Sequence, residues 1–244
     1  MEHNDFIYGT RAVIEAIAAG RELNKVMIQQ GLKNELISEL RHHLKNTEIP
    51  TQYVPAEKLN RLSKKNHQGV IAFASPIVYQ EIETLLPFFF ESGRVPSVVI
   101  LDRVTDVRNF GSIARSAECF GVDAIIVPSR GSALANSDAV KTSAGALNKI
   151  PVCRSSNLKN TIDFLKDSGL RIVACTEKGS KNLHEVDYTI PTAFIMGSEE
   201  DGISPEYLKK ADEQVFIPMS GTISSLNVSV SAAIAFYELQ KQRI

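Results

Sequence analysis

Hydrophobic residues in the second half of the chain gather in short, nearly unbroken runs, and longer stretches of mixed polarity separate these runs. Strands that are covered on both faces have this continuous apolar pattern, whereas amphipathic helices repeat their apolar residues every three to four positions. The apolar runs occupy residues 98–101, 124–127, 171–175, 193–196 and 215–217. Helical patterns occupy residues 109–120, 138–147, 158–167 and 226–242. The alternation predicts an α/β domain with a parallel sheet over residues 97–244.

The first 75 residues show a similar alternation on a smaller scale. One expected helix starts at Thr10, a good capping residue, and another at Pro55, a favourable first helical residue. The remaining elements are an amphipathic helix over residues 33–46 and strands over 25–29, 51–54 and 69–74. We therefore expect a small α/β domain over residues 1–75. Residues 76–96 contain three prolines and predict a linker between the domains.

Composition narrows the class of protein. The chain of 244 residues is 43% hydrophobic and 23% charged, and it contains no apolar run long enough to span a membrane. Residues 1–5 are polar and acidic, unlike a secretory signal. The three cysteines are scattered, which is typical of a reducing cytoplasm. Because Cys119 and Cys175 lie in apolar stretches, we expect both to pack in the core.

Charge says little about the partner, because the net charge is only −1. A basic cluster is concentrated in the first domain, and it consists of Arg61, Lys64, Lys65 and His67. Cations of this kind suit contacts with phosphates. A solvated loop would have the same composition, so both interpretations stay open on charge alone.

Polar residues follow several of the expected strands, at the sheet edge where open α/β sheets bind their ligands. Neither a dinucleotide fingerprint nor a P-loop is present. After the first strand, Asn109 is placed to cap a helix, and Arg115 lies off the apolar face of that helix, where it can pair with Glu118. Taken alone, this segment is better explained by a helix cap and a surface ion pair than by a catalytic or binding role.

Two further segments are more suggestive of a site. The strand ending at Gly197 runs into the acidic turn 199–201 and then Gly202, and a glycine permits close approach of a ligand to the backbone. The segment 217–230 leads into a last helix that Ser224 or Ser225 can cap. That helix is apolar nearly all round, so it must be buried on more than one side. Burial does not explain the polar Asn227 at its start.

Together these segments resemble the SpoU/TrmH branch of the SPOUT RNA methyltransferases. The family pattern N-x-G-x-I-x-R is matched by Asn109, Gly111, Ile113 and Arg115. The pattern G-x-E-x-x-G is matched by Gly197, Glu199 and Gly202. The pattern I-P-M followed by S-L-N-V-S is matched by Ile217, Pro218, Met219 and residues 225–229. The three motifs occur in the family's order. Val107 and Ser112 depart from its usual proline and alanine.

The first domain resembles the L30e-like RNA-binding domain of one subgroup, through Tyr8-Gly9, Val13, Ala16 and the segment 67–70. This architecture is similar to that of bacterial enzymes that methylate a guanosine 2′-hydroxyl in the P loop of 23S ribosomal RNA. The thiostrepton-resistance methyltransferases share the domain, and the tRNA guanosine-18 enzymes lack it. A tRNA substrate, or a non-catalytic RNA-binding protein of the same fold, remain the alternatives.

The resemblance implies a trefoil-knotted catalytic domain, a homodimer in the cytoplasm, S-adenosylmethionine as cofactor and no metal. It implies a cofactor site formed by Thr176, Met196, Gly197, Ile217, Met219 and Leu226. It implies catalytic roles for Asn109, Arg115, Glu199, Ser225 and Asn227. A guanidinium rarely loses its proton, so we expect Arg115 to clamp a phosphate and polarise the nucleophile rather than act as the base. The basic cluster would then bind RNA.

Overall fold

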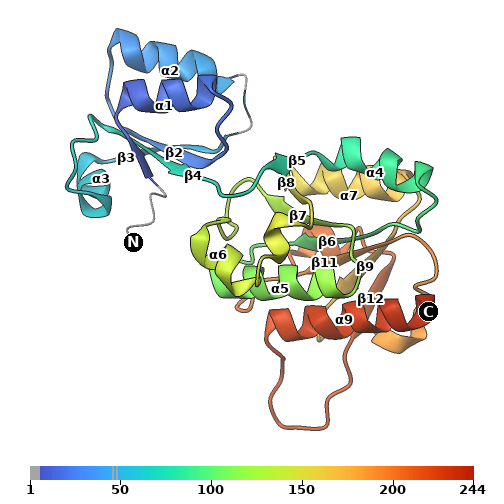
Figure 1. The fold of residues 1–244 in the computed structure, drawn as a ribbon. Helices are drawn as coiled ribbons and strands as arrows, with labels where there is room; N and C mark the ends of the chain where they lie inside the picture. The colour runs from blue at the N-terminus through green and yellow to red at the C-terminus, as the bar shows by residue number, and fades with distance from the viewer. Residues whose placement is uncertain (1–5, 46, 48) are drawn as a thin grey trace. The chain divides into compact units, whose positions relative to one another are not determined.

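The computed structural model describes residues 6–45, 47 and 49–244 (Figure 1). Contacts divide the chain into two compact units, one formed by residues 1–78 and 134–137, the other by residues 79–133 and 138–244. Both units are α/β, which confirms the expected fold class. The polar segment 1–5 and the expected helix end at residue 46 lie outside the described residues.

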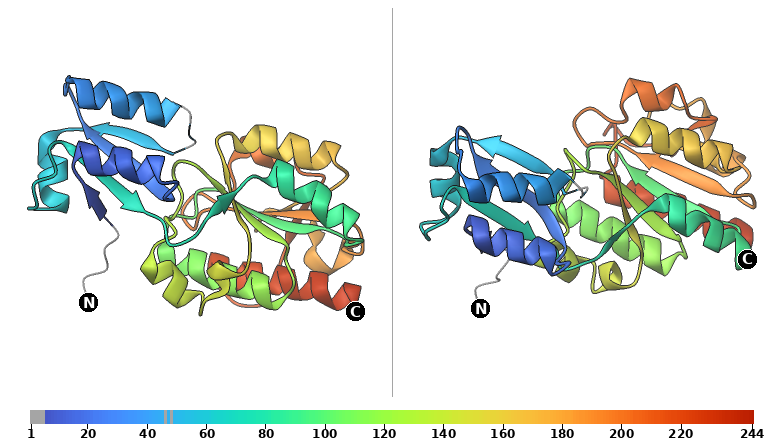
Figure 2. Two further views of the ribbon diagram at one scale, coloured as in Figure 1. Left: turned by 45° about the horizontal axis from the view of Figure 1, so that its top comes forward. Right: turned by 90° about the horizontal axis from the view of Figure 1, so that it is seen from above.

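The first unit is a four-stranded sheet with helices on both faces (Figures 1 and 2). Its strands, in sheet order, are β1 (Phe6–Tyr8), β4 (Val70–Ala74), β2 (Leu23–Gln29) and β3 (Thr51–Val54). The helices α1 (Thr10–Ala18) and α2 (Glu35–Lys45) pack on one face through the larger of two apolar clusters. The shorter α3 (Ala56–Leu62) packs on the other face over a smaller cluster. The three-residue strand β1 is too short to be recognised from periodicity.

The second unit has one eight-stranded sheet in which every pairing is parallel. In sheet order its strands are β10 (Lys181–Asn182), β12 (Glu213–Phe216), β9 (Arg171–Cys175), β11 (Thr192–Met196), β6 (Ser97–Leu101), β7 (Ala124–Pro128), β8 (Val152–Ser155) and β5 (Tyr79–Gln80). From β6 the chain builds outward through β7 to β8 and then returns to β9 on the other side of β11. Ligands of open α/β sheets bind at such a reversal, beside the carboxyl ends of the strands.

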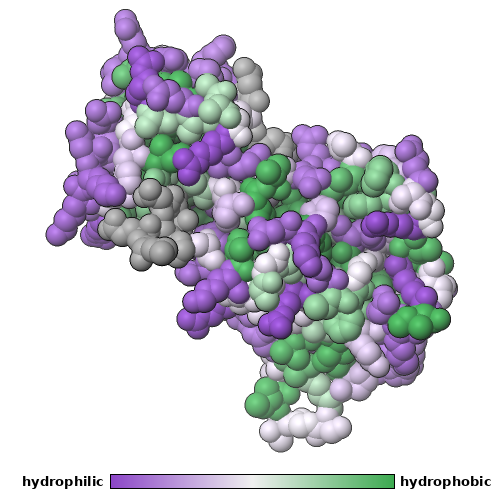
Figure 3. Space-filling view, viewed as in Figure 1, coloured by the Kyte–Doolittle hydropathy of each residue, from purple (hydrophilic) through white to green (hydrophobic). Residues whose placement is uncertain are grey.

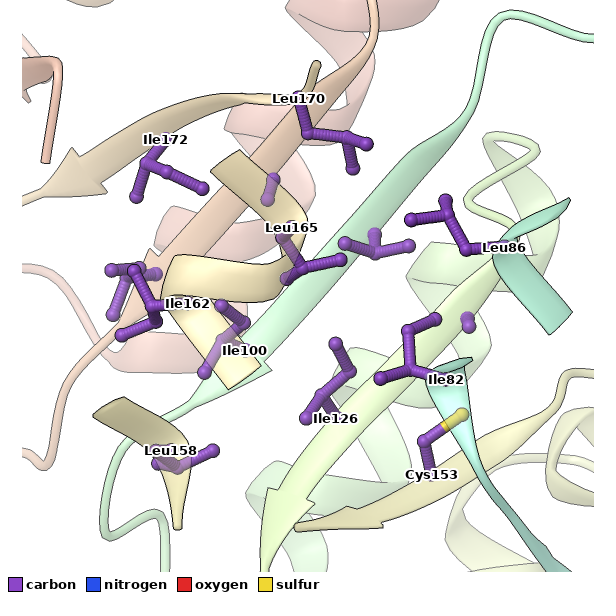
Figure 4. Close-up of a cluster of buried hydrophobic side chains, with 14 of the residues drawn as sticks. Ile82, Leu86, Ile100, Ile126, Cys153, Leu158, Ile162, Leu165, Leu170 and Ile172 are labelled. Atoms are coloured by element: carbon purple, nitrogen blue, oxygen red, sulfur yellow. The ribbon is translucent and has the colours of Figure 1, made fainter. Parts of the chain in front are cut away.

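Helices cover both faces of this sheet, as its continuous apolar strands require (Figures 1 and 2). One face carries α4 (Ile82–Glu91), α7 (Leu158–Asp167) and the short α8 (Pro205–Leu208). Figure 4 shows side chains of α4 and α7 interdigitating with those of the strands. The other face carries α5 (Val107–Cys119) and α9 (Val228–Arg243), while α6 (Ser137–Thr142) and the one-turn helices η1 (Ala146–Asn148) and η2 (Leu183–Glu185) lie in connections.

Two expectations differ from the structure. The stretch 76–96, expected as a linker, contributes β5 to the large sheet, and Ile82, Leu86 and Phe89 of α4 are buried in its core. The helix expected over 138–147 ends at Thr142, because Ala144 and Gly145 adopt positive φ angles of 50° and 87° that an α-helix does not allow.

The start of α5 corrects the expectation for Asn109. The helix begins at Val107, and its cap is Asp106, whose carboxylate accepts hydrogen bonds from the backbone N–H groups of Arg108 and Asn109. The side chain of Asn109 is therefore free for another role. The other end of α5 gives a second correction, because Cys119 is exposed there and not packed in the core.

Within the part of the chain that the structure describes, no helix is both long and apolar enough to cross a membrane.

The cap at Asp106 should contribute measurably to stability. We expect Asp106→Ala to lower the free energy of unfolding by about 0.5–2 kcal/mol, since two backbone N–H groups lose their partner. Urea unfolding monitored by circular dichroism measures this. The matched control is Asp167→Ala at the last residue of α7, where a carboxylate meets the negative end of the helix dipole. Equal losses in the two variants would contradict the assignment of the cap.

Candidate active site

A cavity of about 610 Å³ opens at the carboxyl ends of β9, β11 and β12, inside the second unit. Its walls are the segment after β9, the acidic turn after β11, and the long connection from β12 to α9. The volume is that of a site for a small molecule or cofactor. The parallel sheet thus forms a cavity at the edge where the sequence predicted a ligand.

All six residues expected to bind a cofactor line this cavity. They are Thr176, Met196, Gly197, Ile217, Met219 and Leu226. Met219 and Leu226 are 41% and 39% exposed, so their apolar side chains are accessible to a ligand. The cavity therefore combines an apolar wall with the polar and acidic side chains of the turn 198–202.

Asn227 joins three segments at the rim of the cavity. Its Nδ2 donates to Glu199 Oε1 at 2.5 Å and to Asn109 Oδ1 at 3.0 Å. Its Oδ1 accepts from the backbone N–H of Ser229 at 2.9 Å and from Ser229 Oγ at 2.6 Å. The amide has two donor hydrogens and two acceptor positions, so its hydrogen-bonding capacity is filled. Asn109 and Glu199 are consequently held side by side.

The same contacts explain why a polar residue stands at the start of α9. Asn227 is the N-cap of that helix, which begins at Val228, so neither Ser224 nor Ser225 is the cap. Ser225 instead lines the cavity. Asn227 thus caps the helix, which was expected of Ser224 or Ser225. It also contacts Asn109 and Glu199 in the site.

Arg115 stands apart from this group. It is exposed on α5. It lines neither the large cavity nor a second, smaller cavity that Asn109 and Glu199 line. Six residues advance a helix by about 9 Å and rotate it by about 240°, so Arg115 and Asn109 leave α5 in different directions. Glu118, its expected partner, accepts from Lys149 Nζ at 3.3 Å instead. The structure therefore brings together Asn109, Glu199 and Asn227, but not Arg115.

A second group, missed in the sequence, fixes the acidic turn. Arg103 follows β6 with a positive φ of 57°, and its guanidinium donates to Asp201 Oδ2 at 2.8 Å and to the carbonyl oxygen of Gly202 at 3.2 Å. The buried Asp102 accepts from Arg103 Nε at 3.2 Å and from the backbone N–H of Ser204 at 2.6 Å. The second half of the turn that carries Glu199, and Ser204 beyond it, are thereby tied to the end of β6.

Gly197 has a structural role in addition to the ligand contact expected of it. A Cβ atom at this position would lie 2.2 Å from the carbonyl carbon of Gly202 and 2.3 Å from the nitrogen of Ile203. A glycine is required because the acidic turn folds back against its own strand, where Ser198 and Gly202 pair as a β-bridge. Close approach of a ligand is not needed to explain it.

A smaller cavity of about 230 Å³ lies on the other side of the acidic turn. Arg103, Asp106 and Asn109 line it together with Glu199, and the turn 198–201 and Val228 line both cavities. The side chains that Asn227 holds in place therefore stand between two spaces. Such an arrangement has room for one ligand on each side of Glu199.

Cys175 is the only cysteine among the described residues that lines the large cavity. Burial raises the pKa of its thiol to about 12. The thiolate is the nucleophilic form of cysteine, so this thiol is protonated and unreactive near neutral pH. The cavity can therefore hold an electrophile without a competing thiolate.

The basic cluster lies in the first unit. Arg61, Lys64 and Lys65 are exposed, as phosphate contacts require. His67 is partly buried, with Nδ1 accepting from the backbone N–H of Gly69 at 3.0 Å and Nε2 2.9 Å from Asn60 Oδ1. Both ring nitrogens are occupied, so His67 stabilises the turn before β4, whereas Arg61, Lys64 and Lys65 keep their cationic groups exposed.

The fold and the site define a class of protein, an α/β enzyme with a cofactor-sized cavity at the carboxyl edge of a parallel sheet. A family model described as the SpoU rRNA Methylase family matches residues 96–237. A second model, described as RNA 2′-O ribose methyltransferase substrate binding, matches residues 6–80. The chain belongs to the SpoU/TrmH family of RNA 2′-O-ribose methyltransferases. This confirms the expected enzyme class and an RNA substrate.

Individual relatives agree with the family. A Staphylococcus saprophyticus protein with the provisional name TrmH family tRNA/rRNA methyltransferase is 38% identical over 97% of this chain and 95% of its own length. The A. aeolicus TrmH/SpoU tRNA modifying enzyme is 33% identical, with a TM-score of 0.57 over 66% of this chain and 84% of its own. AviRb, a SpoU methyltransferase from Streptomyces viridochromogenes solved with AdoMet, is 23% identical and has the same fold, with a TM-score of 0.59 over 98% of this chain and 90% of its own.

The raised pKa of Cys175 predicts its reactivity. A pH of 8 is well below the pKa of this thiol, so only a very small fraction of the molecules carries a thiolate. We expect iodoacetamide at this pH to alkylate the exposed Cys119 in the folded protein and to leave Cys175 unmodified, as measured by peptide mass spectrometry. Denaturation should make Cys175 react. Alkylation of both cysteines at equal rates in the folded protein would show that burial does not protect Cys175.

Proposed function

We propose that this chain transfers the methyl group of S-adenosylmethionine to the ribose 2′-hydroxyl of a guanosine in the P loop of 23S ribosomal RNA. The observation that carries the reaction is the hydrogen-bonded group of Asn109, Glu199 and Asn227 at the rim of the large cavity. It combines a carboxylate able to take a proton with amides able to orient a hydroxyl.

The large cavity has the properties that S-adenosylmethionine requires. The apolar side chains of Ile217, Met219 and Leu226 suit an adenine ring, and the carboxylates beyond β9 and β11 suit its hydroxyl and ammonium groups. The bound cofactor supplies an electrophilic methyl group on a sulfonium. The thiol of Cys175 is protonated, so it does not compete with the RNA hydroxyl as a nucleophile for that methyl group. Thr176, Met196 and Gly197 complete the proposed cofactor site.

The acceptor of the proton and the position of the nucleophile follow from the hydrogen-bonding atoms of Glu199 and Asn109 that Asn227 does not occupy. Asn227 occupies Glu199 Oε1 and Asn109 Oδ1, so Glu199 Oε2 and Asn109 Nδ2 are the atoms that can face a substrate. A ribose 2′-hydroxyl placed between them would donate to the carboxylate and accept from the amide. As the new O–C bond forms and the S–C bond breaks, the hydroxyl proton passes to Glu199. Asn227 then acts as a positioning residue.

Arg115 and Ser225 take secondary roles in this proposal. Ser225 lines the cavity, so its hydroxyl can orient the cofactor or the ribose. Arg115 is exposed on α5, where it can bind a phosphate of the RNA substrate. It stabilises the complex from outside the cavity, and the proton goes to Glu199 rather than to the guanidinium.

The first unit supports ribosomal RNA as substrate over tRNA. The A. aeolicus tRNA modifying enzyme corresponds to only 66% of this chain, whereas the substrate-binding model matches residues 6–80. The chain thus has a part with a substrate-binding match, and a tRNA enzyme of the family can act without an equivalent of that part. The exposed cations of Arg61, Lys64 and Lys65 would contact phosphates there.

An exposed apolar surface supports the proposed homodimer. The first ten residues of α9 are mostly apolar, but the helix buries only one side within the chain, and Val230 and Tyr237 on the other side are 47% and 56% exposed. Ile223 in the preceding connection is 77% exposed. Hydrophobic atoms gather over α9 and this connection in Figure 3. A second copy packed on α9 would cover this surface.

The reaction and its target can be tested together. We expect the purified protein, given deuterated S-adenosylmethionine and RNA from a strain lacking its gene, to label one guanosine of the 23S P loop, as mapped by nucleoside mass spectrometry. Glu199→Gln should lower kcat about 10²–10⁴-fold and leave cofactor affinity, measured by calorimetry, nearly unchanged. Glu206→Gln on α8 is the control and should keep full activity.

Each alternative has its own result in that experiment. Label found only in tRNA would show that tRNA is the substrate in place of ribosomal RNA, and the proposed reaction would stand. Cofactor binding without label in any RNA would overturn the catalytic assignment, and full activity of Glu199→Gln would remove its role as proton acceptor.

The dimer is tested on the exposed side of α9. We expect the wild-type protein to elute as a dimer in size-exclusion chromatography with light scattering. Val230→Asp combined with Tyr237→Asp should give a folded monomer, because two charges cannot be buried in an apolar interface. Val78→Asp changes another exposed apolar residue and should remain dimeric. A wild-type monomer at micromolar concentration contradicts the proposal.

A further inference from the structure

One face of the sheet in the first unit is only half covered. Beneath α3 it buries Met27, Val54 and Ile71 against Leu59. Beyond the helix, the aromatic rings of Phe6, Tyr8 and Phe73 pack against this cluster and remain partly exposed. We call these three rings the aromatic platform.

Strand register explains why the rings form one surface. Phe6 on β1 lies opposite Phe73 on β4, and Phe73 lies opposite Lys25 on β2. Tyr8 is two residues beyond Phe6 and therefore on the same face of the sheet. The ring centroids of Phe6 and Phe73 are 4.8 Å apart and those of Phe6 and Tyr8 are 6.0 Å apart. The platform is a continuous row across strands and not a set of isolated residues.

Lysines surround the aromatic platform. Lys25 Nζ lies 4.4 Å from the ring centre of Phe73, and Lys65 Nζ lies 5.3 Å from that of Tyr8. Burial lowers the pKa of Lys25, and the nearby charge of Lys58 on α3 lowers it further. Within the described parts of the chain, none of these three lysines forms an ion pair with a carboxylate. Their positive charge therefore has no carboxylate counterion among the described residues.

Exposed rings beside uncompensated lysines match one class of ligand. Unpaired nucleotides offer flat bases that stack on aromatic side chains, and phosphates that bind lysines. A duplex keeps its bases stacked on one another and cannot use the rings. An apolar protein surface would leave the lysines without partners. The charge and the geometry therefore favour single-stranded RNA over both.

We propose that unpaired nucleotides of the RNA substrate bind across this sheet face, with bases stacked on the aromatic platform and phosphates held by Lys25, Lys58 and Lys65. The proposal rests on the proposed function in that it takes RNA as the substrate. It adds a stacking surface to the exposed cations of Arg61 and Lys64, which continue the positive charge beyond α3.

The opposite face of the same sheet supplies a matched control. Tyr53 on β3 is exposed, and the guanidinium carbon of Arg41 lies 5.4 Å from the centre of its ring. Val54, the next residue, points into the cluster under α3, so Tyr53 belongs to the other face. Among the described residues, this pair has an aromatic ring and a cation but no contact with a second aromatic ring.

The test uses the full-length protein and a ten-nucleotide unstructured RNA containing 2-aminopurine, whose fluorescence falls when the base stacks. We expect the wild type to quench this probe and to prefer it to a blunt RNA duplex of equal length. Tyr8→Leu with Phe73→Leu keeps the apolar packing and should weaken binding at least about tenfold and remove the quenching. Lys25→Gln with Lys65→Gln should reduce the slope of log affinity against log salt by about 1.4.

The control and the contrary results are equally defined. Tyr53→Leu with Arg41→Gln should bind and quench like the wild type. Unchanged affinity and quenching in the Tyr8/Phe73 variant would overturn the proposal, as would a preference for the duplex. A change in oligomeric state caused by that variant, with RNA binding intact, would assign the face to protein contacts.

Cofactor calorimetry and the methyl-transfer assay separate this proposal from the proposed function. Failure of the wild type to methylate any RNA would overturn the function while the fluorescence test still judged the surface. Methylation by the wild type, together with probe binding that the platform substitutions leave unchanged, would overturn the surface alone. The aromatic variant should bind S-adenosylmethionine normally, which also shows that the protein is folded.

Discussion

The site depends on the parallel pairing of β6, β9, β11 and β12, because parallel strands deliver their carboxyl ends to one edge of the sheet. Residues that are separated by more than a hundred positions in sequence meet there. Asn109 and Asn227 are 118 residues apart, and their side chains are hydrogen-bonded. The helices on both faces keep this edge in place by burying continuous apolar strands, so the cavity is a property of the whole second unit.

Within that frame, the carboxamide of Asn227 sets the roles of its neighbours. All four of its hydrogen-bonding positions are used, so its contribution is to fix the orientation of two other side chains. An interaction that caps a helix and orients a carboxylate at the same time couples the stability of α9 to the geometry of the site. Arg103 fixes the conformation of the acidic turn through its hydrogen bonds to Asp201 and Gly202.

The sequence predicted the α/β architecture of both units and three motif residues that the structure brings together, but not the position of Arg115. Continuous apolar strands predicted the parallel sheet, and the three motifs predicted that Asn109, Glu199 and Asn227 share a site, which their hydrogen bonds bear out as geometry. The trefoil knot implied by the resemblance stays a prediction. Local patterns did not distinguish Asp106 from Asn109 as the cap of α5, because either side chain can accept the same hydrogen bonds.

Other features depend on contacts that a single sequence does not contain. Arg103 follows directly after a strand, and no pattern in the sequence marks it as the partner of Asp201, which is 98 residues away. Pro76, Pro87 and Pro96 favoured a linker, but the apolar side of α4 found a partner in the large sheet. Cys119 lies in a mostly apolar segment and is nevertheless exposed, because it falls on the outer side of α5.

One wall of the large cavity consists of the connection between β12 and α9, where residues 218–227 are all exposed. These residues bury little surface within the chain, so a ligand bound in the cavity would add contacts to them. Ordering a chain segment costs conformational entropy, and that cost reduces the net affinity for the ligand. A cavity built in this way favours turnover over tight retention, because departure of the product restores the conformational freedom of its own wall.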